Sequence, residues 1–421
     1  MKVSVLVPVH NSAPYLEACL DSILAQSMGD IEVICVDDGS SDESPDILRR
    51  YAESDGRVRV ITQGCGGVSA ARNVALGHAR GEYVQFVDSD DAIEPGLLAG
   101  VLEVAEPLDA QMASFGFSEW YAKDDVLIAR ELCADESLYG RAFSLADIQG
   151  PATGLMTPAV WHTLFRRDFL DGHGIRFHEE LRTSEDLAFT YEALSCAERI
   201  CLVGSRYYRY RRDASAATLT RVDRGLDGYR ALEHIGAFND GAYLKGGLVA
   251  HYVNLVLDTV RYDLYSAATA SEYLELYRGL LDHWLPLARS HEELIDERYR
   301  AFYQKVRDKD AQQFLFDEYA EYRDALEFQN ARIRGFYERE LSTLRDRLGE
   351  QERALDESRQ EVTRRDDRVV YLENLLSETR GALDSAQRGE QEVRASYAFR
   401  IGRVLTWLPS RFKALVRRVR R

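Results

Sequence analysis

The first ninety or so residues alternate between short apolar runs and amphipathic stretches. Four short runs are almost wholly apolar, which is typical of strands buried in a parallel sheet. Between them, apolar residues recur every three or four positions, as they do on one face of a helix. This alternation predicts an α/β fold with a doubly wound, mostly parallel sheet and helices on both faces. The expected strands cover residues 3–9, 31–36, 57–62 and 82–87.

The character of the chain changes further on. Residues 110–215 mix short apolar runs with amphipathic stretches, whereas residues 221–318 are rich in Tyr and Leu and look helical. We therefore expect an α/β domain over residues 1–220 and a helical domain over residues 221–318.

Apolar residues then recur at intervals of seven, which is the spacing of a coiled coil. They are Leu341, Leu348, Leu355, Val362, Val369, Leu376 and Leu383. The pattern predicts a long coiled-coil helix over residues 319–393 and a homo-oligomer formed through it. Polar residues at Gln351, Ser358 and Arg365 interrupt the second seam, so a single solvated helix is the alternative.

The last part of the chain, residues 394–421, is strongly basic. It carries nine Lys or Arg residues and no acid, while the whole chain has a net charge of −17. After Pro409, apolar residues share one helical face and cations fill the rest, as in helices that lie on anionic membranes. We expect this basic amphipathic tail to contact an anionic membrane surface; the alternative is a solvated end of the coil. The acidic remainder argues against nucleic acid as a partner.

Two absences in the sequence bear on localisation. No run of 18 apolar residues occurs, and the N-terminus enters the first strand pattern without a secretion signal. The six cysteines lack the spacing of metal ligands, which is typical of reduced thiols. These features predict a cytoplasmic protein, held peripherally at the inner face of the cell membrane by its tail.

Polar clusters accompany the strands and the glycine loop of the α/β domain. They occupy residues 7–11, 36–42, 66–73 and 86–91. Ligands of doubly wound sheets bind beyond the carboxyl ends of the strands. The last cluster holds three carboxylates within four residues, which repel one another unless a cation or water lies between them. Carboxylate and phosphate oxygens suit Mg²⁺ or Mn²⁺, although an isolated Asp-x-Asp triplet is also common in surface turns.

Taken in order, three of these clusters resemble the motifs of the family 2 glycosyltransferases. The motifs are Val-Asp-Asp-Gly-Ser-Ser-Asp at residues 36–42, Gly-Gly-Val-Ser-Ala-Ala-Arg-Asn at residues 66–73 and Asp-Ser-Asp-Asp at residues 88–91. The resemblance covers about residues 1–215 and is to bacterial polysaccharide-type transferases. It implies a GT-A fold for a catalytic domain at residues 1–220, and an enzyme that depends on Mn²⁺ or Mg²⁺.

By position, the resemblance implies a site for the nucleoside of the donor. Pro8 and Asn11 would line the nucleotide pocket. Asp38 would bind the pyrimidine base, with support from Asp37. His10 stands where the family usually has tyrosine, so its stacking on the base would be weaker.

The resemblance also assigns residues to the ribose, the diphosphate and the metal ion. Arg72 would reach the nucleotide, and Asp88 would contact the ribose. Asp90 would bind the metal ion. Arg211 lies in a basic segment that could hold the diphosphate leaving group, although a basic strand end with aromatic packing is the alternative.

The catalytic base is implied by Ser-Glu-Asp at residues 184–186, which resembles the family's Gly-Glu-Asp motif. Asp186 holds the position of the base that takes the proton of the acceptor hydroxyl. A single displacement of this kind would invert the anomeric centre. Ser184 departs from the family's glycine. Acids at the start of a helix also stabilise its dipole, which is the alternative explanation of the pair.

These features predict an inverting glycosyltransferase. It would move a hexose or N-acetylhexosamine from a nucleotide-diphosphate sugar, expected to be a UDP-sugar, to a hydroxyl group of a glycan or lipid-linked acceptor in cell-surface polysaccharide synthesis. The alternative from another class is a non-catalytic, degenerate transferase domain on a coiled-coil membrane scaffold. A processive synthase would carry membrane helices and a Gln-x-x-Arg-Trp motif, and a sugar nucleotidyltransferase would carry a glycine-rich loop near its start. The sequence has none of these features.

Overall fold

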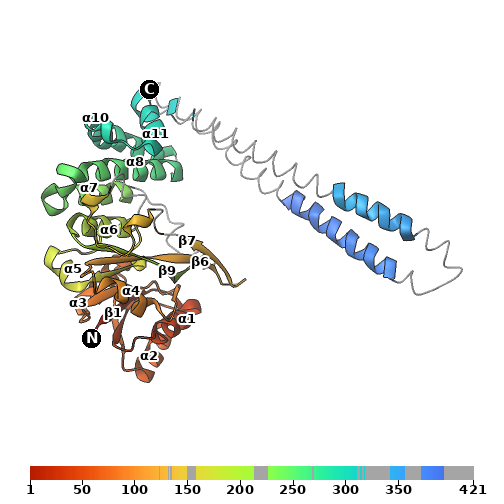
Figure 1. The fold of residues 1–421 in the computed structure, drawn as a ribbon, viewed down its shortest axis with the longest axis horizontal. Helices are drawn as coiled ribbons and strands as arrows, with labels where there is room; N and C mark the ends of the chain where they lie inside the picture. The colour runs from red at the N-terminus through yellow and green to blue at the C-terminus, as the bar shows by residue number, and fades with distance from the viewer. Residues whose placement is uncertain are drawn as a thin grey trace. The chain divides into compact units, whose positions relative to one another are not determined.

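The computed structural model divides the chain into two compact units, Met1–Asp308 and Lys309–Arg421. The first contains a sheet between helices and a further helical layer, and residues 342–355 and 371–392 of the second are helical (Figure 1). The residues that the structure describes are 1–122, 124–130, 132, 135–148, 158–212, 226–267, 270–310, 313, 314, 317, 342–355 and 371–392.

Nine strands of the described residues form a mixed sheet at the centre of the first unit (Figure 1). Its strands follow the order β3-β2-β1-β4-β8-β6-β9-β5, and β7 pairs with β6. The strands are β1 (Val3–Val9), β2 (Ile31–Asp38), β3 (Val58–Gln63), β4 (Tyr83–Phe86), β5 (Ala92–Ile93), β6 (Met112–Tyr121), β7 (Val126–Arg130), β8 (Thr163–Arg166) and β9 (Ile200–Arg211). The first four strands in this order are parallel, whereas β8 is antiparallel to both β4 and β6. The second half of the sheet is therefore mixed.

Helices cover both faces of this sheet. They are α1 (Ala13–Leu24), α2 (Ser44–Ser54), α3 (Val68–His78), α4 (Leu97–Ala105), α5 (Arg167–His173) and α6 (Glu185–Cys196). On one face, Val5 of β1 shares a core with Leu16 of α1 and Val101 of α4. On the other face, Phe86 of β4 packs edge-to-face on Phe189 of α6. The expected α/β architecture with helices on both faces is confirmed.

The register of the parallel strands aligns their carboxyl ends. Val9 of β1 pairs with Asp37 of β2, and Leu6 of β1 pairs with Phe86 of β4. The chain therefore leaves β1, β2 and β4 at the same edge of the sheet. All four expected strands are present, with ends that differ by at most two residues from those expected.

A helical layer completes the first unit. Its helices are α7 (Asp227–Gly241), α8 (Val249–Ser266), α9 (Ala270–Gly279), α10 (Leu285–Ser290) and α11 (Glu297–Asp308). Helix α7 packs on α6, and the Tyr243 hydroxyl donates a hydrogen bond of 2.9 Å to the backbone oxygen of Tyr191. Of the helical region expected over residues 221–318, the described residues up to Asp308 belong to the same compact unit as the sheet, whereas Lys309 begins the second unit. The boundary expected near residue 220 separates two layers of that unit.

In the second unit, residues 342–355 and 371–392 are helical and lie side by side (Figure 1). The Thr379 hydroxyl of one segment donates a hydrogen bond to the Gln351 side chain of the other, 28 residues away in sequence. A continuous helix would separate two such residues by about 42 Å. The expectation of one uninterrupted helix over residues 319–393 is therefore wrong, because two segments of the same chain pack on each other.

Two apolar residues of the heptad pattern are buried in these paired segments. Leu355 and Leu376 are 4% and 7% exposed, and each belongs to one of the two paired segments. An ion pair of 2.9 Å joins Arg380 to Glu352 across the same pair of helices. Part of the apolar seam is therefore covered within one chain. The homo-oligomer through the coiled coil stays a prediction, and it loses this part of its support.

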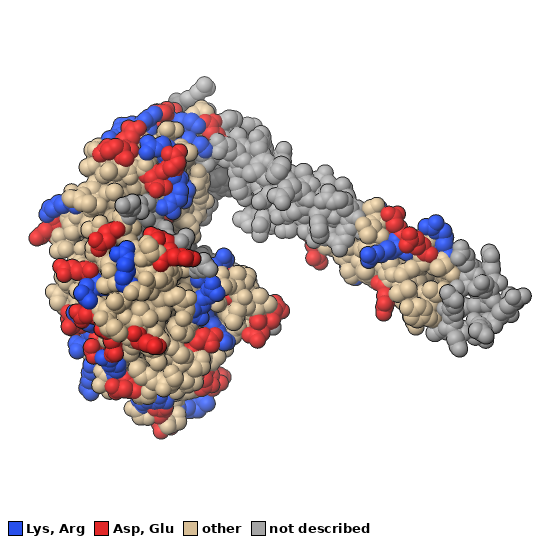
Figure 2. Space-filling model, in the orientation of Figure 1, with Lys and Arg blue, Asp and Glu red and all other residues tan. Residues whose placement is uncertain are grey.

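The basic tail at residues 394–421 lies outside the described residues. Among the helices that are described, none is long and apolar enough to cross a membrane. On the face displayed in Figure 2, Lys and Arg are interspersed with Asp and Glu. Membrane contact through the tail stays a prediction.

Candidate active site

The loops after β1 and β2 are tied to each other at the carboxyl edge of the sheet. The backbone N–H of Asn11 donates to the Ser40 hydroxyl at 3.0 Å, and the Asn11 side-chain oxygen accepts from the backbone N–H of Ser41 at 2.8 Å. Asn11 has a φ of 50°, a left-handed conformation that Asn adopts more readily than most residues. Asn11 therefore fixes the position of the two loops. Pro8 is buried within β1, where it pairs with Val36.

The carboxylate of Asp38 holds the glycine loop in front of α3. One oxygen accepts hydrogen bonds from the Gln63 side chain at 2.8 Å and from the backbone N–H of Gly66 at 2.7 Å. The other oxygen accepts from the backbone N–H of Gly67 at 2.8 Å. A side chain at Gly66 would come within 3.0 Å of the next turn of α3, and Gly67 has a φ of 90°. Glycine is therefore favoured at position 67 by its backbone conformation and at position 66 by the close approach of α3.

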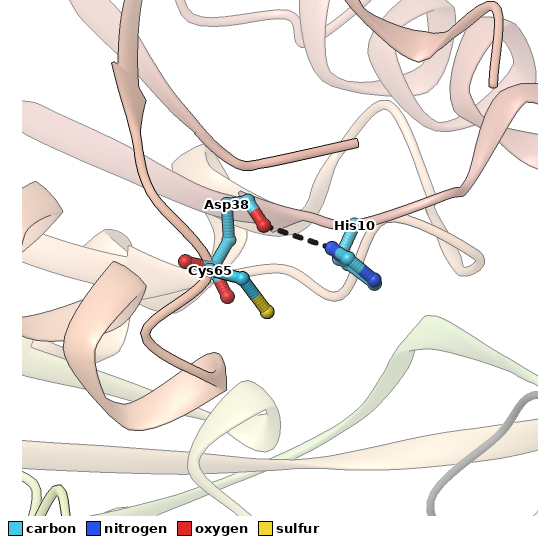
Figure 3. A group of neighbouring side chains, drawn as sticks. All are labelled: His10, Asp38 and Cys65. Atoms are coloured by element: carbon cyan, nitrogen blue, oxygen red, sulfur yellow. Dashed lines mark hydrogen bonds between the residues drawn. The ribbon is translucent and has the colours of Figure 1, made fainter. Parts of the chain in front are cut away.

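His10 and Cys65 lie beside Asp38 (Figure 3). The His10 Nδ1–H donates to the backbone oxygen of Asp38 at 2.8 Å. Each of the three side chains offers an atom within 4.8 Å of the others, a spacing that could suit a metal ion. The Asp38 carboxylate, however, already accepts three hydrogen bonds, and Asp37 beside it accepts one from the backbone N–H of Ser40 at 3.1 Å. The group therefore suits a wall of the expected base-binding region better than a metal site.

Arg72 of α3 joins two acidic motifs that are far apart in sequence. Its Nη1 lies 2.9 Å from Glu185 and 2.6 Å from Asp186, and its Nη2 lies 2.9 Å from Asp88. Arg72 is 3% exposed. Burial alone would lower the pKa of Arg72, but Asp186, Asp88 and Glu185 raise this pKa above its usual value, so the guanidinium stays charged. The residue expected to reach the nucleotide is thus enclosed by carboxylates, and it fixes Asp186 next to Asp88.

The carboxylates around Arg72 carry more negative charge than one cation balances. Burial raises the pKa of Asp186 to about 8; Arg72 opposes this shift, while Glu185 and Asp88 add to it. Burial also raises the pKa of Asp90 to about 6, with a further contribution from Asp88. A carboxylate with a pKa near neutrality is suited to take up a proton during a reaction. The side chain of Asp186 is 22% exposed, so an acceptor molecule can reach it.

Asp91 anchors the Asp-Ser-Asp-Asp segment to β9. It is 1% exposed, and its carboxylate accepts hydrogen bonds from the Tyr208 hydroxyl at 2.8 Å and from the backbone N–H of Arg211 at 2.7 Å. The Tyr208 hydroxyl in turn accepts from the backbone N–H of Asp88 at 3.1 Å. Asp91 therefore has a structural role, while the less buried Asp88 and Asp90 are available to a ligand.

Arg211, at the end of β9, lies against the same segment. Its Nε–H donates to the backbone oxygen of Asp90 at 2.6 Å. The guanidinium carbon is 4.0 Å from the centre of the Trp120 ring and 5.1 Å from that of the Tyr15 ring. These contacts hold a cation next to Asp90, where it can pair with a phosphate group.

The Asp88–Asp91 segment fits a divalent cation that the substrate helps to bind. Mg²⁺ is usually held by one or two carboxylates together with substrate phosphates, and Mn²⁺ takes similar oxygen ligands. Burial raises the pKa of Asp90, and the negative charge of Asp88 adds to this shift; a cation at Asp90 would oppose both effects. Among the described residues, the groups of three or more side chains that could hold an ion lie elsewhere. A cation at Asp90 would therefore need oxygen atoms from a donor molecule.

Ser184 precedes α6 in a left-handed conformation, with a φ of 63°. This conformation costs a residue with a side chain about 1–2 kcal/mol, a cost that glycine avoids. The backbone geometry thus explains why glycine suits this place in the motif. It also turns the chain so that Glu185 and Asp186 begin α6 beside Arg72.

The sequence did not predict that Arg72 bridges two acidic motifs or that Asp91 anchors its segment to β9. Arg72 and Asp186 are 114 residues apart, a pairing that no local pattern reveals. One signal was available: Ala75 and Leu76 follow Arg72 at three and four positions, so all three share the buried face of α3. A buried arginine needs carboxylate partners, and the Ser-Glu-Asp motif at residues 184–186 was the acidic motif that could supply them.

Comparison with known proteins shows relatives of the α/β part of the chain. Residues 4–170 match the family described as glycosyl transferase family 2. The uncharacterised glycosyltransferase EpsJ of Bacillus subtilis is 34% identical over 216 residues, which are 51% of this chain and 62% of EpsJ. The poly(ribitol-phosphate) β-N-acetylglucosaminyltransferase TarS of Staphylococcus aureus is 32% identical over 220 residues, which are 50% of this chain and 35% of TarS. The chain thus spans less than two thirds of either relative.

A solved structure resembles a larger part of the chain. The crystal structure of S. aureus TarS 1-349 in complex with UDP matches with a TM-score of 0.60 and 24% identity, over 77% of this chain and 92% of that chain. At this identity the likeness concerns the fold, and it agrees with the sheet and helices described above. Residues 4–170, with their ordered motifs at the carboxyl edge of the sheet, are a glycosyltransferase family 2 domain with the GT-A fold.

Proposed function

We propose that this protein is an inverting, metal-dependent glycosyltransferase that uses a nucleotide-diphosphate sugar. The observation that carries the proposal is the Arg72 bridge, because Asp88 and Asp186 contact the same guanidinium. A candidate base with a raised pKa therefore lies next to the segment expected to bind the donor. A degenerate domain would have little reason to keep this arrangement of charges.

The donor would bind across the carboxyl ends of β1, β2 and β4. His10 and the loop held by Asp38 would border the nucleobase, and Asp88 would contact the ribose. Arg211, fixed between Trp120 and Tyr15, would pair with the diphosphate. TarS has been crystallised with UDP and with UDP-GlcNAc, which supports a UDP-sugar as the donor here.

Asp90 would hold a divalent ion, Mn²⁺ or Mg²⁺, together with the diphosphate. Such an ion neutralises the charge that develops on a departing diphosphate. Protonation of Asp90 below its pKa of about 6 would weaken this binding. The Arg211 cation beside Asp90 would add to the stabilisation of the leaving group.

Asp186 would take the proton of the acceptor hydroxyl as that oxygen attacks the anomeric carbon. The ion pair with Arg72, at 2.6 Å, orients the carboxylate as a base. Attack from the side opposite the diphosphate in one step inverts the configuration of the sugar.

The pKa of Asp186 predicts how the rate depends on pH. A base acts only when it is deprotonated, so kcat/KM for transfer should fall as the pH decreases below about 8. Glu185→Gln removes one of the negative charges that raise this pKa. We expect the acid limb of the pH–rate profile to move to lower pH in that variant. A limb that stays in place, or moves to higher pH, would contradict Asp186 as the group that titrates.

We propose a hydroxyl group of a glycan or lipid-linked glycan in cell-surface polysaccharide synthesis as the acceptor. The relative TarS is named for transfer to poly(ribitol phosphate), which is a polymer of this general kind. The basic tail at residues 394–421 would hold the protein at the inner face of the cell membrane, where lipid-linked acceptors are exposed. The full chain should bind anionic vesicles, and a variant that lacks residues 394–421 should not. Unchanged binding by that variant would contradict this location.

A screen of nucleotide sugars by thermal shift tests the proposed function. With Mn²⁺ present, a donor at about 100 times its Kd should stabilise the fold by about 2.7 kcal/mol. The donor that gives the largest rise in Tm identifies both base and sugar. Asp90→Asn should lose the dependence of this rise on Mn²⁺. If no nucleotide sugar raises the Tm of the wild-type protein, the transferase proposal fails and the scaffold alternative gains.

A further inference from the structure

A second group of polar side chains converges between α7 and the loop that leads into α6. His178 and Glu180 lie in the loop, and His234 lies in α7. One ligand atom of each lies within 4.8 Å of the other two. Glu180 Oε1 is 2.9 Å from His234 Nε2 and 3.7 Å from His178 Nδ1. Two imidazole nitrogens therefore face one carboxylate.

The distances between these atoms suit a tetrahedral metal site. With bonds of about 2.0–2.1 Å to zinc, neighbouring ligand atoms are about 3.3 Å apart. The observed 2.9 and 3.7 Å lie on either side of this value, so a rotation of one imidazole ring with small shifts of the side chains would complete the site. Imidazole nitrogens favour Zn²⁺, whereas Mg²⁺ and Mn²⁺ favour sites made of oxygen atoms alone. This group and the Asp90 segment therefore select different ions.

A buried carboxylate orients one of the two histidines. The side chain of Glu192 in α6 is 2% exposed, and its oxygen lies 2.7 Å from His178 Nε2. If Nε2–H donates to Glu192, the lone pair of Nδ1 is left facing Glu180. Histidines that bind metals commonly donate their other ring N–H to a carboxylate in this way. Glu192 is thus a positioning residue for His178.

The two imidazole rings also stack on each other. The centres of the His178 and His234 rings are 3.8 Å apart, and the ring planes differ by 20°. Two protonated rings at this distance would repel each other. A cation that accepts a lone pair from each neutral ring would remove this repulsion and balance the negative charge of Glu180. Because each lone pair lies in the plane of its ring, one ring must turn out of the stack to reach that cation.

We propose that His178, Glu180 and His234 bind one Zn²⁺ per chain, with the fourth position left to water. The ion would fasten α7 to the loop that ends at the start of α6, and so would support the position of Asp186. A hydrogen-bonded link already exists nearby, where Asp227 at the start of α7 accepts from two backbone N–H groups of the loop at 3.0 and 3.1 Å. The zinc site would be separate from the donor site in its ligands and in its function.

Zinc titration of the full chain tests this inference. Metal-free protein that carries Asp90→Asn, which removes the proposed metal ligand of the donor site, is titrated with Zn²⁺ by calorimetry. We expect one ion per chain and a higher Tm with zinc. Co²⁺ in place of Zn²⁺ should give the visible absorption of a tetrahedral complex. Glu192→Gln should weaken zinc binding by about 10–100-fold, the effect typical of residues that orient a ligand.

His234→Ala and Glu180→Gln should each weaken zinc binding by at least about tenfold. The Glu180 side chain is 58% exposed, so Glu180→Gln tests the site even if His234→Ala unfolds. His283→Ala removes an exposed histidine of another helix and is the matched control, which should bind zinc as the wild-type protein does. The inference is overturned if the parent protein binds no zinc, or if both site variants bind zinc as tightly as the control.

Discussion

Replacing Asp186 by asparagine is expected to lower the rate of sugar transfer by about 10²–10⁴-fold, the usual contribution of a general base. Asparagine has the size of aspartate but cannot take up the acceptor proton. Its side-chain oxygen can still accept from Arg72, which lies 2.6 Å from Asp186. Donor binding should therefore be nearly unchanged. Measuring kcat beside the donor-induced rise in Tm separates the two effects.

Glu185→Gln is the matched control for this variant. Glu185 also contacts Arg72, at 2.9 Å, and begins the same helix, but its side chain is less exposed than that of Asp186. Its replacement should cost far less activity at a pH where Asp186 is deprotonated. If Asp186→Asn kept near-normal turnover, or if Glu185→Gln were the variant that lost it, the assignment of the base would be wrong.

Replacing Arg72 by methionine is expected to destabilise the first unit by about 3–5 kcal/mol, because a buried ion pair that loses one partner leaves uncompensated charge. Here three carboxylates, Asp88, Glu185 and Asp186, would lose their shared cation. Transfer activity should be lost as well, since the base would no longer be oriented. Denaturant-induced unfolding measures the change in stability.

Arg49→Met provides the comparison for this loss. Arg49 forms an ion pair with Asp46 in which both side chains are more than 60% exposed. Exposed pairs of this kind contribute about 0–1 kcal/mol. If Arg72→Met were no more destabilising than Arg49→Met, the buried carboxylates around Arg72 would not need its positive charge for the stability of the fold.

The first half of the sheet could be predicted because its signals are local. Apolar runs such as residues 3–9 can be recognised one at a time, and parallel pairing follows from the strand–helix alternation. The second half could not be predicted in this way. Strand β8, for example, has only four residues and is inserted between β4 and β6 by contacts with distant parts of the chain.

The candidate site was predictable as a set of motifs but not as an arrangement. The clusters containing Asp38 and Asp90 follow strands whose carboxyl ends share one edge, which the pattern indicates. The hydrogen bonds that the Asp38 carboxylate accepts from the backbone of Gly66 and Gly67 could not be predicted from the motifs. The partners of a buried polar group depend on tertiary packing.

The helices after residue 341 show a different limit of sequence patterns. A seven-residue repeat indicates that an apolar seam is covered, but not whether a second chain or the same chain covers it. Here the contact between Thr379 and Gln351 lies within one chain. The His178 group was missed for a related reason, because His234 is 56 residues away and reaches it only through the packing of α7 on α6.

The proposal that Asp88, Asp90 and Asp186 serve one reaction is tested most directly by measuring release of the nucleoside diphosphate. The substrates are an acceptor glycan and the nucleotide sugar that stabilises the protein most. We expect release that requires Mn²⁺ or Mg²⁺ and that is lost in both Asp90→Asn and Asp186→Asn. Release that continues unchanged in both variants, or no release by the wild-type protein with any donor it binds, would contradict the proposed site.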